Sequence, residues 1–380
     1  MIHKNRRMLV VGMIDSPHLT HWLVEIARMN LFSSIYVFPS TSPKPAGTLN
    51  VSKLGTPIKV LGIFPTKRLT SWLFTFFDKI LGLKWRSTIL LIAIRVLRPS
   101  LLHVHELQHG GYLLDKRILE IRKMKILCST WGSDLVLYGK LQSHKEKLTR
   151  LLKRTDFLLT ERSIDLEIAH ELGFNGIAIT PSYATIGAED FEESVLPPSE
   201  RKKILVKGYQ DNHGRALNVL QALTLIRENL ASYEVVVISA SESVQVMVEF
   251  MKNVFQINIV CAPKLNREEI FQLFKESRIY IGLGISDGIS NTMIESMQTG
   301  AFPIQSVNSC APEFIQDGIS GFIVDPWDIS RLTSHIKRSL TDNQLVDNAV
   351  RLNLHTLREK YSKKRGLKVL DELYQGILDD

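Results

Sequence analysis

The sequence predicts an α/β protein made of two doubly wound domains, each with a parallel sheet covered by helices. Short apolar runs of strand length alternate with longer stretches of helical periodicity, which is the pattern of a parallel sheet packed on both faces. The alternation breaks at residues 184–203, a proline-containing stretch that is acidic and then basic, and resumes after it. The length of 380 residues also suits two domains. We therefore expect domains at about 1–190 and 200–361.

The first domain is expected to begin with a buried strand at residues 8–14, MLVVGMI. A basic head precedes this run, as in a signal peptide. The run is short, however, ends at Asp15 and lacks a small-residue cleavage site, so we expect a cytoplasmic protein. The same patterns predict strands at 34–40, 57–64, 100–106, 125–134 with its loop, 156–161 and 176–183, and helices at 18–30 and from about 111.

The second domain repeats the alternation from residue 203 onwards. Apolar runs and helical periodicity predict strands at 203–209, 233–240, 257–262, 278–284 and 301–306, and helices at 215–229, 243–254, 267–277 and 291–299. In doubly wound sheets ligands bind at the carboxyl ends of the strands. The loops after these strands are therefore the places to look for chemistry.

The composition favours certain classes of binding partner but does not select one of them. The net charge of +8 favours anionic partners such as nucleic acid, nucleotide phosphates or acidic lipid. The three cysteines have no metal spacing, which suits a reducing compartment. The sequence contains no run of about 20 apolar residues, so no transmembrane helix is predicted.

The stretch SDGISNTMIESMQTG, residues 286–300, joins a predicted strand to a predicted helix. Ser290 or Asn291 can cap the helix, whose amino end then favours an anion or a polar oxygen. Asp287 lies in the loop and Glu295 about one turn into the helix. Carboxylates accept strong hydrogen bonds from hydroxyl groups. The stretch thus suits a nucleoside-diphosphate sugar, which has hydroxyls at both ends and phosphates between them.

The segment from residue 286 to 326 closely resembles the donor-binding segment of the retaining glycosyltransferases of family four. The positions that carry the resemblance are Asp287, Gly288, Glu295, Met297, Gly300, Pro303, Glu313, Asp317, Gly318, Gly321 and Pro326. The resemblance implies the GT-B architecture, in which two Rossmann-like domains face each other across a cleft. It also implies a C-terminal helix, at about 362–380, that packs back on the first domain.

The resemblance assigns roles within this segment. It places Asp287 on a sugar hydroxyl, Glu295 on the ribose hydroxyls, and the backbone of Gly288, Ile289, Ser290 and Asn291 on the donor. The family has Glu where this chain has Asp287, so the carboxylate reaches one methylene less far. A dinucleotide fingerprint at Gly282-x-Gly284 is rejected, because its third glycine would fall on Asp287 and no acid follows twenty residues later.

The family clamps the donor diphosphate with a basic pair near the start of the second domain. Tyr209 stands where the family has Arg, and Arg215 falls near the position of its Lys. We expect Arg215 and Lys207 to take these roles, because cations stabilise the leaving diphosphate. The alternatives are a solvated first-turn helix residue for Arg215 and an outward-facing strand-end lysine for Lys207.

Three histidines surround the strand at 100–106: His103, His105 and His109. Their spacing resembles a zinc cluster, but no acidic or cysteine ligand pattern completes it. In the family a His after this strand touches the donor sugar, which favours His105 and then His109. A buried, hydrogen-bonded structural histidine is the alternative for each.

Other candidates lie on the acceptor side of the first domain. STWGSD, at 129–134, resembles a family strand end, so Asp134 is either a substrate contact or a structural cap. The first strand–helix loop lacks the glycine pair usual in the family. It offers Asp15, His18 and His21 as further acceptor-side candidates.

Residues 68–98 mix Trp, Phe and Leu with Lys and Arg. Such a stretch can lie in a membrane interface, and ordinary core helices also look like this. A lipid-linked acceptor at the inner face of the membrane would explain both the charge and the aromatic residues.

The expected activity is transfer of a hexosyl or N-acetylhexosaminyl group from a nucleotide sugar to a hydroxyl, with retention. The resemblance implies neither metal nor cofactor, and the partners expected are the donor, a saccharide or lipid-linked acceptor and an anionic membrane, but no nucleic acid. The setting expected is synthesis of cell-surface polysaccharide, lipopolysaccharide or glycolipid. A degenerate, partner-binding subunit and a GT-B epimerase or phosphorylase remain as alternatives.

Overall fold

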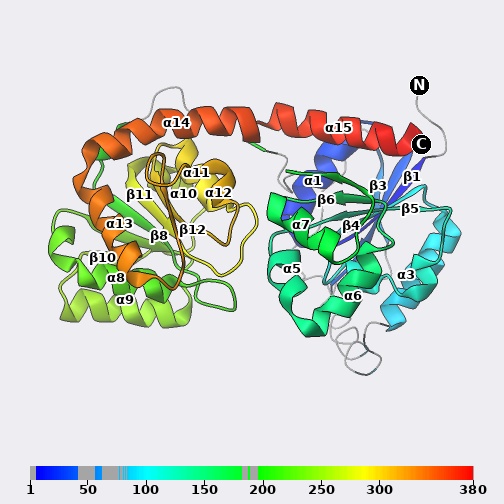
Figure 1. Ribbon diagram of the computed structural model, residues 1–380, viewed down its shortest axis with the longest axis horizontal. Helices are drawn as coiled ribbons and strands as arrows, with labels where there is room; N and C mark the ends of the chain where they lie inside the picture. Colours follow the sequence, from blue (N-terminus) through cyan, green and yellow to red (C-terminus); the bar gives the residue numbers. More distant parts are fainter. Residues whose placement is uncertain are drawn as a thin grey trace. The chain divides into compact units, whose positions relative to one another are not determined.

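The computed structural model describes residues 6–41, 56–61, 77, 80, 82, 84–181, 187–188 and 196–379. The chain divides into two compact units, each an α/β layer structure (Figure 1). Unit 1 comprises Met1–Gly187 and Lys363–Asp380, and unit 2 comprises Ala188–Ser362. Half of the predicted linker, residues 184–186 and 189–195 of 184–203, lies outside the described residues.

Unit 1 contains a seven-stranded sheet in the order β3-β2-β1-β4-β5-β6-β7. All neighbouring strands pair in parallel, as the strand–helix alternation predicts. The strands are β1 (Arg7–Gly12), β2 (Ser34–Pro39), β3 (Ile58–Val60), β4 (Leu101–His105), β5 (Lys125–Ser129), β6 (Phe157–Leu159) and β7 (Ile177–Ile179). Their apolar residues are buried because helices cover both faces of the sheet.

The helices of unit 1 are α1 (Pro17–Arg28), α3 (Lys84–Leu97), α4 (Lys116–Leu119), α5 (Ser133–Val136), α6 (Gln142–Leu152), α7 (Ser163–Glu171) and α15 (Lys363–Asp379). Short 3₁₀ turns lie at Gly111–Leu113 and Tyr138–Lys140. Helix α15 lies beside α1 and shares one apolar core with it (Figure 1). The Nζ atom of Lys363 also lies 3.0 Å from the Glu25 carboxylate on α1. Residues 363–379 are therefore an integral part of unit 1.

Unit 2 contains a six-stranded parallel sheet in the order β10-β9-β8-β11-β12-β13. Its strands are β8 (Lys203–Lys207), β9 (Glu234–Ile238), β10 (Ile259–Cys261), β11 (Ser277–Gly282), β12 (Phe302–Ser306) and β13 (Phe322–Val324). Its helices are α8 (Ala216–Leu225), α9 (Glu242–Val254), α10 (Arg267–Glu276), α11 (Asn291–Gln298), α12 (Ala311–Phe314), α13 (Ile329–Thr341) and α14 (Asn343–Tyr361), with 3₁₀ turns at Pro198–Glu200 and Arg227–Leu230. One large apolar cluster takes alternate residues of these strands, so it lies on one face of the sheet, where α8, α9 and α13 pack.

The predicted elements recur with shorter bounds. The strand expected at 57–64 is β3, with residues 62–64 outside the described part. The segment 68–98 contains α3, while residues 68–76 of it are not described. Among the described residues, no helix is long and apolar enough to cross a membrane.

Candidate functional site

The order of the strands reverses direction at one place in each sheet. In unit 1 this place lies between β1 and β4, and in unit 2 between β8 and β11. Ligands of doubly wound sheets bind beyond the carboxyl ends of the strands at such a place. The predicted site residues fall there, since His105 ends β4, Lys207 ends β8 and Asp287 follows β11.

Lys207 and Asp287 form an ion pair at the carboxyl ends of β8 and β11. The Nζ atom of Lys207 lies 3.3 Å from Oδ2 of Asp287 and 5.2 Å from the ring centroid of Tyr209. Burial disfavours the ammonium, but the Asp287 carboxylate outweighs burial, so the pKa of Lys207 is raised. The sequence analysis expected Asp287 on a sugar hydroxyl and Lys207 on the diphosphate, and the structure pairs the two side chains with each other. Asp287 therefore fixes the place of the cation.

The loop that carries Asp287 is held by backbone hydrogen bonds to the segment after β12. The Asp287 N–H donates to the Asn308 carbonyl at 3.0 Å, and the Gly288 carbonyl accepts from the Cys310 N–H at 3.1 Å. Ser290 is the N-cap residue of α11, but its side chain makes no capping hydrogen bond. The prediction that a side chain caps this helix is thus wrong for Ser290, although the helix begins at Asn291 as expected.

Buried polar atoms gather at the strand ends of unit 2. Within the described residues, Oγ of Ser286, Oε1 of Gln305 and Nε2 of His213 are buried without a hydrogen-bond partner. Native proteins leave few such atoms unpaired, because each costs about 1–3 kcal/mol. A polar ligand or solvent at this edge of the sheet would satisfy them.

Glu295 lies one turn into α11, as the sequence predicted, and its side chain is half-buried. Burial raises the pKa of its carboxyl group, and Arg267 opposes this shift. Such a carboxylate gains more from a hydroxyl donor than an exposed one does, since it has lost hydration.

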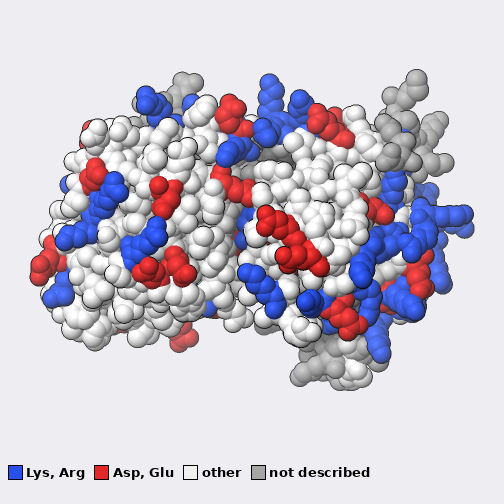
Figure 2. All heavy atoms as spheres, in the orientation of Figure 1, with Lys and Arg blue, Asp and Glu red and all other residues white. Residues whose placement is uncertain are grey.

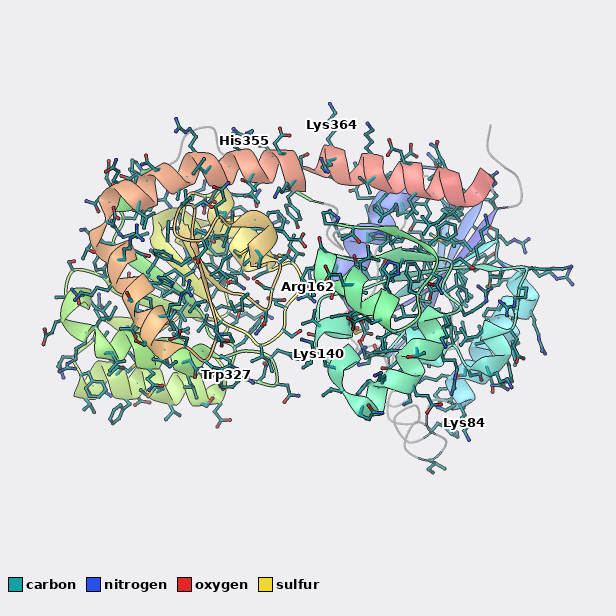
Figure 3. The ribbon with its side chains drawn as sticks, viewed as in Figure 1. Lys84, Lys140, Arg162, Trp327, His355 and Lys364 are labelled. Atoms are coloured by element: carbon teal, nitrogen blue, oxygen red, sulfur yellow. The ribbon has the colours of Figure 1, made fainter. Side chains whose placement is uncertain are left out.

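Arg215 lies just before α8, in a loop that is joined to the end of β11. One guanidinium nitrogen donates to the carbonyls of Asp211 and Gly214 at 3.0 and 2.6 Å. The guanidinium also lies 4.9 Å from the ring centroid of Trp327, which is 62% exposed. Trp327 is labelled in Figure 3. Trp327 is not among the residues predicted from the sequence, although an aromatic residue directly after Pro326 was a usable signal.

His105 ends β4 in the interior of unit 1 and is 1% exposed. Trp22 and Trp131 lie edge-on to its ring at centroid distances of 4.4 and 5.7 Å. Both ring nitrogens are without a partner among the described residues. Burial lowers the pKa of His105 to about 3, so the imidazole is neutral at pH 7. It can therefore accept or donate a hydrogen bond without carrying charge.

The other two histidines of this region have different partners. Nδ1 of His109 lies 2.8 Å from the Glu106 carboxylate, and this hydrogen bond raises the pKa of His109. Both ring nitrogens of His103 contact hydroxyl groups, as described below. Among the described residues, no group of three or more His, Cys, Asp or Glu could hold a metal ion.

Asp134 is buried, and both oxygens of its carboxylate contact the backbone. Oδ1 accepts from the Leu107 N–H at 2.5 Å, and Oδ2 accepts from the Trp131 N–H at 2.6 Å. Asp134 thus joins the loops after β4 and β5, which is the structural role that the sequence left open beside a substrate contact.

The other acceptor-side candidates lie around the start of α1. Asp15 is half-buried in the loop after β1, and His21 is exposed on α1. His18 lies edge-on to Trp131 at 6.1 Å. The structure therefore brings His18, Trp131 and His105 together.

Asp134 predicts a pH dependence of stability. Burial, followed by the charge of Glu106, raises the pKa of Asp134 to about 8, compared with about 3.9 for an unfolded Asp. The folded state therefore holds this proton more tightly, and the free energy of unfolding should fall as pH rises from about 4 to about 8, by up to about 1.4 kcal/mol per unit. Urea unfolding of the wild type and Asp134→Asn across this range measures the effect.

The Asn variant should lack this contribution and show a shallower pH slope. Asp115→Asn, at the N-cap of α4, removes a carboxylate from the same unit and should keep the wild-type slope. An unchanged slope in Asp134→Asn would contradict the assignment.

Two comparisons with known sequences match part of the chain. Residues 188–353 match the family model described as glycosyl transferases group 1. A sucrose synthase from Melioribacter roseus is 30% identical over 109 residues, which are 27% of this chain and 14% of that protein. The matched region is thus a small part of that relative.

Solved structures resemble the chain at low sequence identity. Sucrose-phosphate synthase from Thermosynechococcus elongatus has a TM-score of 0.76 and 11% identity, covering 98% of this chain and 99% of the other. Anabaena HepE in complex with UDP and glucose has a TM-score of 0.68 and 11% identity, covering 98% and 100%. These likenesses establish the GT-B fold, which confirms the predicted fold class.

Proposed function

Since residues 188–353 match the family model of the group 1 glycosyl transferases, we propose that the chain transfers a sugar from a nucleoside diphosphate to an acceptor hydroxyl with retention. The observation that carries the proposal is the arrangement beyond β8 and β11. There the Asp287 carboxylate, which is ion-paired with Lys207, the amino end of α11 and the partly buried Glu295 follow one another along residues 287–295. This order matches the order of sugar, diphosphate and ribose in a donor.

Residues of unit 2 would contact the sugar, the diphosphate and the ribose of the donor. The Asp287 carboxylate would accept from a sugar hydroxyl, and the backbone of residues 288–291 would face the phosphates at the start of α11. Lys207 and Arg215 would stabilise charge on the leaving diphosphate, and Glu295 would accept from the ribose hydroxyls.

The reaction would need little proton chemistry from protein side chains. The leaving phosphate oxygen would take the proton of the incoming hydroxyl on the same face of the sugar, which gives retention. His105 is neutral, and neither of its ring nitrogens has a partner in the part of the chain that the structure describes, so it would hydrogen-bond a hydroxyl of the transferred sugar without adding charge. A hexosyl or N-acetylhexosaminyl group fits these contacts.

A donor screen tests the function. Release of nucleoside diphosphate from UDP-, GDP- and ADP-sugars should be seen with one of them, and anomeric NMR of the product should show retention. Failure of every donor to bind in calorimetry would favour a non-catalytic subunit, and dependence on inorganic phosphate would favour a phosphorylase.

We further propose that unit 1 docks on anionic membrane through α3, as suits a lipid-linked acceptor in cell-surface glycan synthesis. Ile92 and Val96 are 55% and 72% exposed and lie one turn apart. Lys84, Arg95 and Arg98 are exposed on or just after the same helix. Lys and Arg side chains gather over this side of unit 1 (Figure 2). Each basic residue near acidic lipid contributes roughly 1 kcal/mol and is screened by salt.

Co-sedimentation with phosphatidylglycerol liposomes measures this docking. Binding should rise with anionic lipid and fall with salt. The double variant Ile92→Ser, Val96→Ser should weaken it at least about a hundredfold, since burying each aliphatic side chain contributes roughly 1.5–3 kcal/mol. Trp72 and Phe76 also belong to segment 68–98 but lie outside the described residues.

Two exposed apolar residues of unit 2 provide the matched control. Val246 and Phe250 are 65% and 48% exposed on α9, and their replacement by Ser should leave liposome binding unchanged. Equal losses in both pairs, or none in the α3 pair, would refute docking through α3.

A further inference from the structure

A buried imidazole in unit 1 is held between two hydroxyl groups. Nδ1 of His103 lies 2.8 Å from the Tyr374 hydroxyl oxygen, and Nε2 lies 2.7 Å from Oγ of Ser129. His103 and Tyr374 are fully buried and Ser129 is 6% exposed. Tyr374 belongs to α15, 271 residues from His103 along the chain.

The same imidazole stacks on the ring of His105. The two ring centroids are 4.1 Å apart with an interplanar angle of 26°. Trp22 lies edge-on to both rings, at 4.7 Å from His103 and 4.4 Å from His105. His105 itself makes no hydrogen bond among the described residues, so ring packing alone fixes its plane.

Burial determines how the hydroxyl groups must behave. It lowers the pKa of His103 and raises the pKa of Tyr374, so both are neutral at pH 7. A neutral imidazole donates at one nitrogen and accepts at the other. One hydroxyl therefore accepts while the other donates, and both ring nitrogens of His103 are satisfied. The two contacts fix the orientation of the His103 ring from both sides, and either tautomer satisfies them.

We propose that Tyr374 is a positioning residue for His105, acting through His103. The hydroxyl of α15 holds His103 in one orientation, and the stacked His103 holds the imidazole of His105 in the plane that meets the sugar hydroxyl. This role rests on the proposed function of His105, and it makes α15 part of the supporting layer of the site.

Tyr374→Phe removes a single oxygen and keeps the aromatic contacts with Trp22 and Phe32. With UDP-glucose, or the nucleotide sugar that the screen selects, kcat should fall about tenfold, less than the hundredfold that a 1 Å misplacement can cost. The KM for the donor should change less than twofold. In the His105→Ala background, Tyr374→Phe should cause no further fall.

The chain offers a matched control in unit 2. The Tyr233 hydroxyl is buried and donates to the Leu340 carbonyl at 3.0 Å. Tyr233→Phe should lower the unfolding midpoint about as much as Tyr374→Phe while leaving kcat unchanged. A fall in kcat of the same size in both variants would show that Tyr374 only stabilises the fold.

Long-range ¹⁵N NMR of the histidine rings gives a readout that is independent of activity. The ring nitrogen signals of both His103 and His105 should shift in Tyr374→Phe, and those of His109 should not. Unchanged His105 signals, or multiplicative losses of kcat in the double variant, would overturn the proposal. Shifted signals in a protein that transfers no sugar would leave the positioning intact and instead refute the proposed function.

Discussion

Replacement of Lys207 by alanine is expected to lower turnover about a hundredfold, the scale seen when one preorganised charge-stabilising group is removed. Lys207 is the cation at the end of β8, and its pKa is raised by the neighbouring Asp287, so it carries full charge at working pH. Negative charge grows on the diphosphate as it leaves, so kcat should fall more than the selectivity among sugars. Steady-state nucleoside diphosphate release measures both.

Two variants separate the loss of the cation from the loss of its partner. Lys203→Ala removes a partly exposed lysine at the opposite end of β8, where it pairs with Glu276 at 2.7 Å, and should leave turnover unchanged. Lys207→Ala with Asp287→Asn tests whether the unpaired Asp287 carboxylate adds to the defect.

Arg215→Ala should also lower turnover, since Arg215 is the second proposed cation. Near-normal turnover in both Lys207→Ala and Arg215→Ala would show that the diphosphate is bound elsewhere.

The second large effect is expected at Glu295. Glu295→Gln keeps the shape of the side chain and loses charge-assisted hydrogen bonds to the ribose, at about 1.5–3 kcal/mol. The donor dissociation constant should therefore rise by one to two decades. Calorimetric titration with the donor found in the screen measures this change.

Because the pKa of Glu295 is raised, the donor affinity measured in the same experiment should depend on pH. The carboxylate is the binding form, so wild-type affinity should weaken as pH falls through the raised pKa, and the Gln variant should lack this dependence. Glu249→Gln, at an exposed position of α9, serves as the control and should bind like the wild type. Unchanged donor affinity in Glu295→Ala would refute the ribose assignment.

Local patterns predicted most of the fold because parallel strands buried on both faces have short apolar runs. Runs such as those in β8 and β11 needed no tertiary information. The elements after residue 306 were harder to predict, because β13 is only three residues long and α12 only four. Their burial depends on neighbours that are distant in the sequence.

The site was predictable wherever a single loop contains the chemistry, as at 286–295. Contacts between distant residues were not predictable. The Lys207–Asp287 pair spans 80 residues and the Tyr374–His103 contact spans 271, and no local spacing encodes either. The role of Asp134 could not be decided from the sequence either, because a carboxylate at a strand end looks the same in sequence whether it binds a ligand or the backbone.

Helix α15 also has a consequence for synthesis of the protein. Leu370, Leu373, Tyr374 and Ile377 complete the apolar core formed by α1 and the sheet of unit 1, yet the ribosome makes them after all of unit 2. Unit 2 is a continuous segment and can fold as soon as it has emerged. The apolar surface of α1 must meanwhile wait for residues 363–379, so the half that is translated first is the half that finishes folding last.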